Sequence, residues 1–160
     1  MAEMRVGLGY DLHRTIIGRP LILGNIQIPH ERGLEGHSDA DIVVHALIDA
    51  LTGAAGLPDV GQQFPNTDPR YKNINSAELL KATNAAFQKA GWRLVNADFV
   101  ILAQRPMLSP YKPAMIKRLA ELLGVKETQI NLKGKTGERV GALGKEKAMA
   151  CQCVVLIEKD

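Results

Sequence analysis

The sequence predicts an α/β protein of the α+β sandwich kind, with a single mixed sheet and helices packed mainly on one face. Strand-like and helix-like segments are interleaved along the chain, and several of the strand-like pieces resemble hairpins. The 160 residues, 46% of them hydrophobic, suffice for a core. No repeat, low-complexity tract or linker divides the chain, so we expect a single catalytic domain over residues 1–160.

Strands are expected before the first helix, over residues 5–12, 21–23 and 26–28. Asp11 and His13 lie at the end of the first of these strands. The dipeptide Gly24-Asn25 favours a tight turn between the other two. A polar loop is expected over residues 30–37.

Three helices are predicted, over residues 39–55, 76–90 and 109–124. Ser38 or Asp39 can cap the first helix, and Gly56 ends it. Ser76 can cap the second helix. Gly, Pro, Asn and Asp predict a turn-rich loop between these two helices, over residues 58–75. The remaining strands are expected over residues 93–104, 129–135 and 149–158, the last of which contains a run that suggests a buried strand, Val154–Ile157.

Charge and composition argue against nucleic acid or a membrane as partners. The net charge is only +3, and three Phe, three Tyr and one Trp offer few platforms for stacking bases. A denser basic run over residues 133–147 fits a small anionic ligand better. No apolar stretch approaches membrane-spanning length, and the first residues do not form a signal peptide. We therefore expect a cytoplasmic protein, in which Cys151 and Cys153 are packed thiols in a reducing compartment.

Three of the four histidines, His13, His37 and His45, fall in two Asp-containing stretches that suggest a metal centre. Asp11 and His13 are two residues apart on an extended segment. Because side chains of a strand point to alternate sides, both of these point to the same side. Together with His45 on a nearby helix they provide three protein ligands and leave a fourth position for substrate. Zinc suits this mixture of donors, and iron, manganese or cobalt also fit. The alternative is structural: His45 pairs with Asp41 or Asp49, four residues away on the same helix face.

Other polar segments suggest phosphate binding. The run His37-Ser38-Asp39 at a helix start favours an anion, although simple capping explains its last two residues. Asp59 and Asp68 either bind substrate hydroxyls or form turns. Neither the Walker A loop nor the dinucleotide fingerprint is complete. A strand end with lysines and Thr136 remains, which can contact phosphate and hold a hard cation through Glu138.

Six motifs occur in an order that resembles the 2-C-methyl-D-erythritol 2,4-cyclodiphosphate synthases, lyases of the non-mevalonate isoprenoid pathway. The resemblance covers nearly the whole chain. The motifs are Asp11-x-His13, His37-Ser-Asp-Ala-Asp41 with His45, Asp59-Val-Gly61, Phe64-Pro-Asn-Thr-Asp68, Ala103-Gln-x-Pro106 and Lys135-Thr-x-Glu138.

The resemblance implies a homotrimer with active sites between neighbouring subunits. It implies that Asp11, His13 and His45 bind zinc or another divalent transition metal, and that Glu138 helps hold magnesium or manganese. His37 and Thr136 would stabilise the transition state. The implied substrate contacts at the methylerythritol phosphate are Asp11, His13, His37, Ser38, Asp59, Val60, Gly61, Phe64, Pro65, Asn66, Thr67 and Asp68. Those implied at the cytidine end, from an adjacent subunit, are Ala103, Gln104, Arg105, Pro106, Met107, Leu108, Ser109, Lys135, Thr136, Gly137, Glu138, Ala142 and Lys145.

Four positions depart from the pattern of the family. Asn66 replaces a usual Asp, Met107 a common Lys, and Ala142 a usual aromatic residue. Lys145 stands in for Arg, which binds phosphate with a different geometry. All four lie at the phosphate and nucleotide end of the implied site, and none is a metal ligand.

The implied reaction is an intramolecular phosphoryl transfer, which explains why the chain needs no nucleophilic side chain of its own. The substrate is a cytidine diphosphate methylerythritol that carries a second phosphate, and CMP is released. Two other functions are compatible with the residues. A zinc-dependent phosphoester hydrolase would use the same ligands. In a non-catalytic binding module, Asp11 and His13 would only brace a turn.

Overall fold

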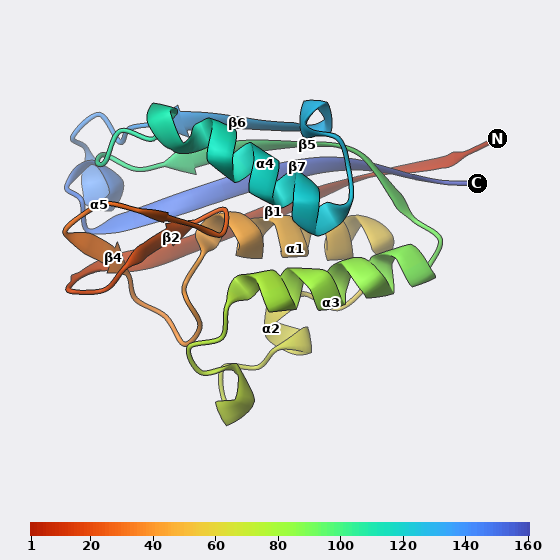
Figure 1. The fold of residues 1–160 in the computed structure, drawn as a ribbon, viewed down its shortest axis with the longest axis horizontal. Helices are drawn as coiled ribbons and strands as arrows, with labels where there is room; N and C mark the ends of the chain where they lie inside the picture. The colour runs from red at the N-terminus through yellow and green to blue at the C-terminus, as the bar shows by residue number, and fades with distance from the viewer.

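The computed structural model describes residues 1–160 and contains one five-stranded mixed sheet (Figure 1). The strand order is β4-β1-β7-β5-β6, and only β5 and β6 pair in parallel. A separate antiparallel hairpin is formed by β2 and β3. The strand bounds are β1 Glu3–Ile17, β2 Leu21–Leu23, β3 Ile26–Ile28, β4 Arg32–Leu34, β5 Arg93–Leu102, β6 Ile130–Lys135 and β7 Ala148–Lys159.

The longer helices cover one face of this sheet, as the sequence predicts. They are α1 (Ile42–Ala55), α3 (Ser76–Lys89) and α4 (Lys112–Leu123). Helix α1 lies against β1 and β7, α4 lies against β6, and α3 packs on both helices. No helix is both long enough and apolar enough to cross a membrane. Shorter helical segments are α2 (Val60–Gln63), α5 (Gly141–Gly144) and the 3-10 turns Pro69–Tyr71, Ser109–Tyr111 and Glu127–Gln129.

The opposite face of the sheet carries exposed apolar side chains. Along β1 they alternate with residues that face the helices, because strand side chains point to opposite sides in turn. Val6 is 69% exposed and Leu8 65% exposed. On β7, Val154 is 45% exposed while Val155 is buried, so the expected buried run is buried on one side only. The uncovered face comprises Met4, Val6, Leu8, Tyr10, Leu12 and Val154.

Two glycines bring β1 and α1 into close contact. Gly7 and Gly9 lie on the face of β1 that α1 covers, and both are buried. A Cβ on Gly9 would collide with the carbonyl oxygen of Ala46, and one on Gly7 would collide with that of Ala50. The backbones therefore approach more closely than any other residue at these two strand positions would permit.

The first strand is longer than the sequence predicts. Pairing with β7 runs from Glu3 to Arg14, and β4 then pairs with the end of β1. Asp11 and His13 therefore lie within the strand rather than at its end. Strand β4 occupies part of the polar loop expected over residues 30–37. Backbone hydrogen bonds to β1 favour a strand there although the sequence of the loop is polar.

The helix caps also differ from the prediction. Asp41 caps α1 in place of Ser38 or Asp39, so the helix begins at Ile42, and Ala40 before the cap has a positive φ of 56°. The Asp41 carboxylate accepts backbone N–H groups from Val43 and Val44 of α1 and from the β2–β3 turn. Burial and the neighbouring Asp39 raise the pKa of Asp41 to about 6. Four backbone donors thus converge on one buried carboxylate, which ties the hairpin to the helix.

Three further boundaries are corrected. Asn75, not Ser76, caps α3 through its side-chain oxygen. The expected loop over residues 58–75 contains α2 and a 3-10 turn. Helix α4 begins at Lys112 rather than Ser109, because the preceding residues form a 3-10 turn.

The close contact at Gly9 gives a stability prediction. We expect Gly9→Ala to lower the free energy of unfolding by at least about 1–3 kcal/mol, because the new methyl group displaces α1. Urea denaturation followed by circular dichroism would measure the change.

Gly53→Ala is the matched control. Gly53 lies within α1, and a Cβ there meets no atom within 4 Å. The control should be neutral or stabilising by up to about 1 kcal/mol. Equal destabilisation by both substitutions would contradict the close-contact explanation.

Candidate active site

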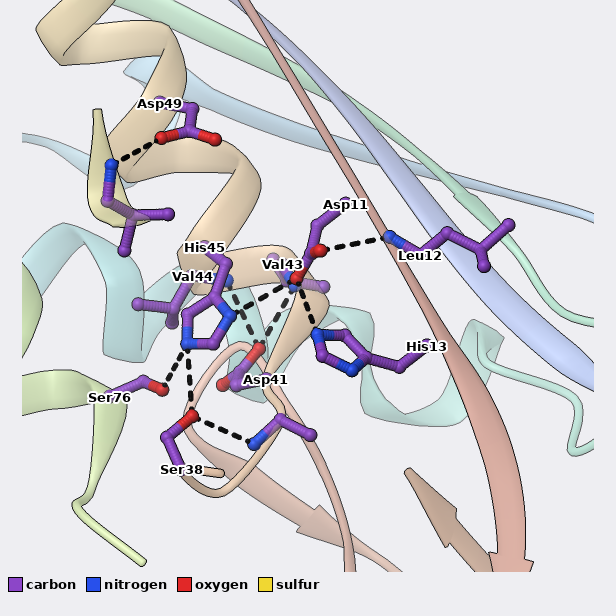
Figure 2. Close-up of polar contacts among 12 residues, drawn as sticks. Asp11, Leu12, His13, Ser38, Asp41, Val43, Val44, His45, Asp49 and Ser76 are labelled. Atoms are coloured by element: carbon purple, nitrogen blue, oxygen red, sulfur yellow. Dashed lines mark hydrogen bonds and ion pairs between the residues drawn. The ribbon is translucent and has the colours of Figure 1, made fainter. Parts of the chain in front are cut away.

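Asp11, His13 and His45 converge at the contact between β1 and α1 (Figure 2). Asp11 Oδ2 lies 3.2 Å from Nε2 of His13 and 3.1 Å from Nδ1 of His45. The two strand residues share a face with Gly7 and Gly9, and His45 lies in the first turn of α1. One potential ligand atom from each residue lies within 4.8 Å of the others.

This arrangement fits a divalent transition metal. In a tetrahedral zinc site, nitrogen and oxygen ligands about 2.0 Å from the ion lie about 3.3 Å from one another. The two distances from Asp11 are close to that value. Two imidazoles and one carboxylate are also a typical ligand set for a catalytic zinc with one open position.

The electrostatics keep Asp11 ionised. Burial opposes ionisation, but hydrogen bonds from His13 and His45 outweigh it and lower the pKa of Asp11 to about 2. The pKa of His13 is raised, chiefly by its hydrogen bond to Asp11 and against the effect of burial. The site therefore presents an anionic ligand between two imidazoles.

The three candidate metal ligands Asp11, His13 and His45, together called the metal cluster below, adjoin a cavity of about 230 Å³. Its walls come from β1, from the segment before α1, from α2 and from the loop that leads to α3. The lining residues predicted from the sequence are Asp11, His13, His37, Ser38, His45, Val60, Gly61, Phe64 and Asn66. The lining residues that sequence reasoning missed are Gly36, Tyr71, Ile74 and Leu79.

Tyr71 is the one missed residue that the sequence could have indicated. It is one of two aromatic residues, with Phe64, in a turn-rich loop that is mostly polar. Its ring packs edge-on against Phe64, with the ring centroids 5.4 Å apart. The other three missed residues are small or aliphatic, and only the fold places them at the cavity.

Several predicted substrate contacts do not line this cavity, namely Asp59, Pro65, Thr67 and Asp68. Asp59 caps α2, accepting from the backbone of Gln62. The Asp68 carboxylate accepts from Arg70, while its backbone carbonyl lies 3.1 Å from Nε2 of His37. In this structure both carboxylates accept hydrogen bonds within turns. This is the turn-forming role that the sequence left open as the alternative to substrate binding.

The structural alternative for His45 is not observed, because His45 pairs with Asp11 and with neither Asp41 nor Asp49. Asp41 is buried in its cap, and Asp49 accepts the backbone N–H of Val60 at 2.8 Å. Asp49 therefore anchors α2 beside the cavity rather than pairing with His45. Burial raises the pKa of Asp49, partly offset by this hydrogen bond.

A second cavity, of about 320 Å³, contains most residues of the implied cytidine end. It shares no lining residue with the first cavity. Gly134 also lines it and was not predicted. The predicted residues that line it are Ala103, Gln104, Arg105, Pro106, Met107, Leu108, Ser109, Lys135 and Thr136.

The remaining predicted residues lie outside both cavities. The Thr136 hydroxyl donates to the Glu138 carboxylate at 3.2 Å, so Glu138 adjoins the second cavity but lies apart from the metal cluster. Gly137 packs against Gly144 of α5, and Lys145 ends that helix. Ala142 lines a third cavity, together with Leu12, Arg14, Thr15, Arg32, Lys147 and Ala148.

The model of the YgbB family matches residues 4–158. The chain belongs to the YgbB family. A family relative from Dechloromonas aromatica, named 2-C-methyl-D-erythritol 2,4-cyclodiphosphate synthase, is 51% identical over 98% of each chain. A relative of the same name from Geobacillus thermodenitrificans is 48% identical, also over 98% of each chain.

Solved structures of YgbB-like proteins share the fold. The bifunctional IspDF from Campylobacter jejuni superposes with a TM-score of 0.96 at 39% identity. That match covers all of this chain but 43% of the bifunctional protein. A CDP complex of IspF from Plasmodium falciparum has a TM-score of 0.87 at 32% identity, covering 98% of this chain and 97% of that one. The mixed sheet covered by helices on one face is thus confirmed.

The metal cluster gives a direct prediction. We expect His45→Ala to lose most bound zinc after dialysis and most activity, because two ligands hold the ion far less tightly than three. Elemental analysis of the purified protein would measure zinc per chain.

His30→Ala is the control for this prediction. His30 is the fourth histidine and lies outside the cluster, so its removal should leave zinc content unchanged. Full zinc retention in His45→Ala would reject the assignment of His45 as a ligand.

Proposed function

We propose that this chain converts 4-diphosphocytidyl-2-C-methyl-D-erythritol 2-phosphate to 2-C-methyl-D-erythritol 2,4-cyclodiphosphate with release of CMP. Residues 1–160 would act as one catalytic domain, in the cytoplasm. The observation that carries the proposal is the cluster of Asp11, His13 and His45 at the mouth of a cavity. Relatives named for this cyclisation match along nearly the whole chain.

The proposed step is internal to the substrate. An oxygen of the 2-phosphate attacks the β-phosphorus of the diphosphate, and a new P–O bond closes the ring. The bond between that phosphorus and the oxygen shared with the cytidine phosphate breaks, and CMP leaves with that oxygen. No water is consumed, and the protein contributes positioning and electrostatic stabilisation. Pre-alignment of this kind is worth up to about 7–11 kcal/mol in model systems.

The chain's own residues would hold and orient the substrate at two places. The first cavity would receive the methylerythritol phosphate, with His37 and Ser38 at its wall. The second cavity would receive the cytidine end, where Lys135 and Thr136 at its wall would face the phosphates. His37 and Thr136 would stabilise the charge that develops in the transition state.

Two cations would complete the site. Asp11, His13 and His45 would hold zinc or another divalent transition metal, and Glu138 would help hold magnesium or manganese. When bound, such ions neutralise charge on the diphosphate and make its phosphorus a better electrophile.

We propose further that three copies assemble through the uncovered sheet face. A row of exposed apolar side chains of this size on one face is typical of an interaction surface. Assembly would allow the first cavity of one subunit to meet the second cavity of its neighbour. The resemblance described above supports the same arrangement.

Product identity tests the reaction. We expect incubation with the cytidyl substrate to give CMP and a cyclic diphosphate, with no inorganic phosphate. Phosphorus NMR would follow these products. The matched substrate without the 2-phosphate should release no CMP, because it lacks the attacking oxygen. CMP released from that substrate would favour the rival zinc-dependent phosphoester hydrolase, which uses water instead.

Oligomeric state tests the assembly. Leu8→Glu places a carboxylate in the uncovered face and should convert the trimer to monomers in sedimentation experiments, because burying an unpaired charge is costly. Activity should fall with it. Ala114→Glu, on the exposed side of α4, should leave the oligomer intact. Trimers that persist in Leu8→Glu would contradict this interface.

A further inference from the structure

The two imidazoles of the metal cluster face Asp11 through different nitrogens. His13 does so with Nε2 and His45 with Nδ1 (Figure 2). A neutral imidazole can bind a cation only through its unprotonated nitrogen, so its proton must be on the other one. The hydrogen-bond partner of that other nitrogen therefore decides whether the ring can act as a ligand.

The proton of His13 is placed by the main chain. Its Nδ1 lies 2.6 Å from the carbonyl oxygen of Glu35. A carbonyl oxygen only accepts, so Nδ1 carries the proton and donates it. The hydrogen bond that Nε2 makes to Asp11 can then give way to a cation, because Nδ1 keeps the proton that the neutral ring needs.

His45 Nδ1 faces the Asp11 carboxylate, which only accepts and so holds a proton there while no cation is bound. Once a cation replaces that proton, His45 must carry its proton on Nε2, which two hydroxyl groups contact. Its Nε2 lies 3.0 Å from Oγ of Ser76 and 3.3 Å from Oγ of Ser38 (Figure 2). A hydroxyl can donate or accept, so neither contact alone fixes the tautomer. Ser38 accepts the backbone N–H of Ala40 and keeps its own proton available. Acting alone, Ser38 would donate to Nε2 and shift the ring proton to Nδ1, where it would block the cation.

The pairing of Ser76 with Asp39 decides this contest. The Ser76 hydroxyl donates to Oδ1 of Asp39, and the Ser76 backbone N–H donates to Oδ2 at 2.8 Å. Asp39 also accepts the backbone N–H of Asp41. Because a carboxylate only accepts, the single proton of the Ser76 hydroxyl is committed. Ser76 is fully buried, so it can only accept from His45 Nε2–H.

We propose that Asp39 and Ser76 are positioning residues that hold the proton of His45 on Nε2 and so free Nδ1 for the cation. The relay runs from the Asp39 carboxylate through the Ser76 hydroxyl to the ring. It acts on the metal centre of the proposed function and depends on that centre. Loss of such an outer partner typically weakens metal binding by about 10–100-fold.

The test compares Ser76→Ala with Ser38→Ala. Ser76→Ala keeps the backbone N–H that bonds to Asp39, so α3 should stay capped. We expect zinc affinity, measured by competition with a chelating dye, to fall by about 10–100-fold in Ser76→Ala. Ser38→Ala removes the competing donor and should bind zinc at least as tightly as the unmodified chain.

A spectroscopic measurement separates positioning from a merely structural role. Long-range proton–nitrogen correlation spectra of the metal-free protein, labelled at histidine, report which ring nitrogen carries the proton. The spectra are compared in the Asp11→Ala background, because the Asp11 carboxylate otherwise holds a proton on Nδ1 of His45. In Asp11→Ala alone, we expect a neutral His45 ring to carry its proton on Nε2. In Ser76→Ala the population should shift toward Nδ1. In Ser38→Ala it should stay on Nε2.

Two outcomes would overturn the inference. One is a proton on Nδ1 of the neutral His45 ring in Asp11→Ala. The other is unchanged zinc affinity and an unchanged tautomer in Ser76→Ala, while the unmodified chain binds zinc. An unmodified chain that binds no zinc would instead contradict the metal centre of the proposed function, and the relay's role with it.

Discussion

The close contact of α1 with β1 determines most of what this molecule can do. Gly7 and Gly9 leave room for the helix backbone, and the next residues on that strand face are Asp11 and His13. His45 reaches Asp11 only because the helix lies this near. The same strand face thus provides first a surface for packing and then two ligands, so stability and metal binding depend on one interface. A helix displaced by a side chain at either glycine would separate His45 from its partners.

The uncovered side of the sheet is the counterpart of this one-sided packing. Because the helices occupy one face, every second residue of β1 is left without a partner within the chain. Burying such side chains stabilises by about 25 cal/mol per Å² of apolar surface, which gives copies of the chain a reason to associate. Under the proposed assembly, the two separate cavities of each chain would be half-sites, and association on the uncovered face would bring half-sites of different chains together.

Much of this could be predicted from the sequence, and the rest could not, for definite reasons. The spacing of Asp11 and His13 predicted that both side chains share one strand face, because that depends on local geometry alone. The approach of His45 depends on the packing of α1 on β1, and the resemblance to the family pointed to it. The cap at Asp41 was missed, because its four donors include two from a distant hairpin that no local pattern reveals. The length of β1 depends on pairing with β7, which lies at the other end of the chain. The closeness of Gly9 to α1 is likewise a tertiary fact, although two glycines in a strand are a signal that could have been used.

The way each imidazole is oriented has a consequence for how the protein can change over evolutionary time. His13 is held by a main-chain carbonyl, which every amino acid at position 35 supplies. Its orientation is therefore insensitive to the side chain there, and that position is free to drift. His45 is oriented by side chains, so a single nucleotide change in the codon of Ser76 or Asp39 can alter its orientation. The orientation of one imidazole is thus protected by the backbone, while that of the other is open to selection.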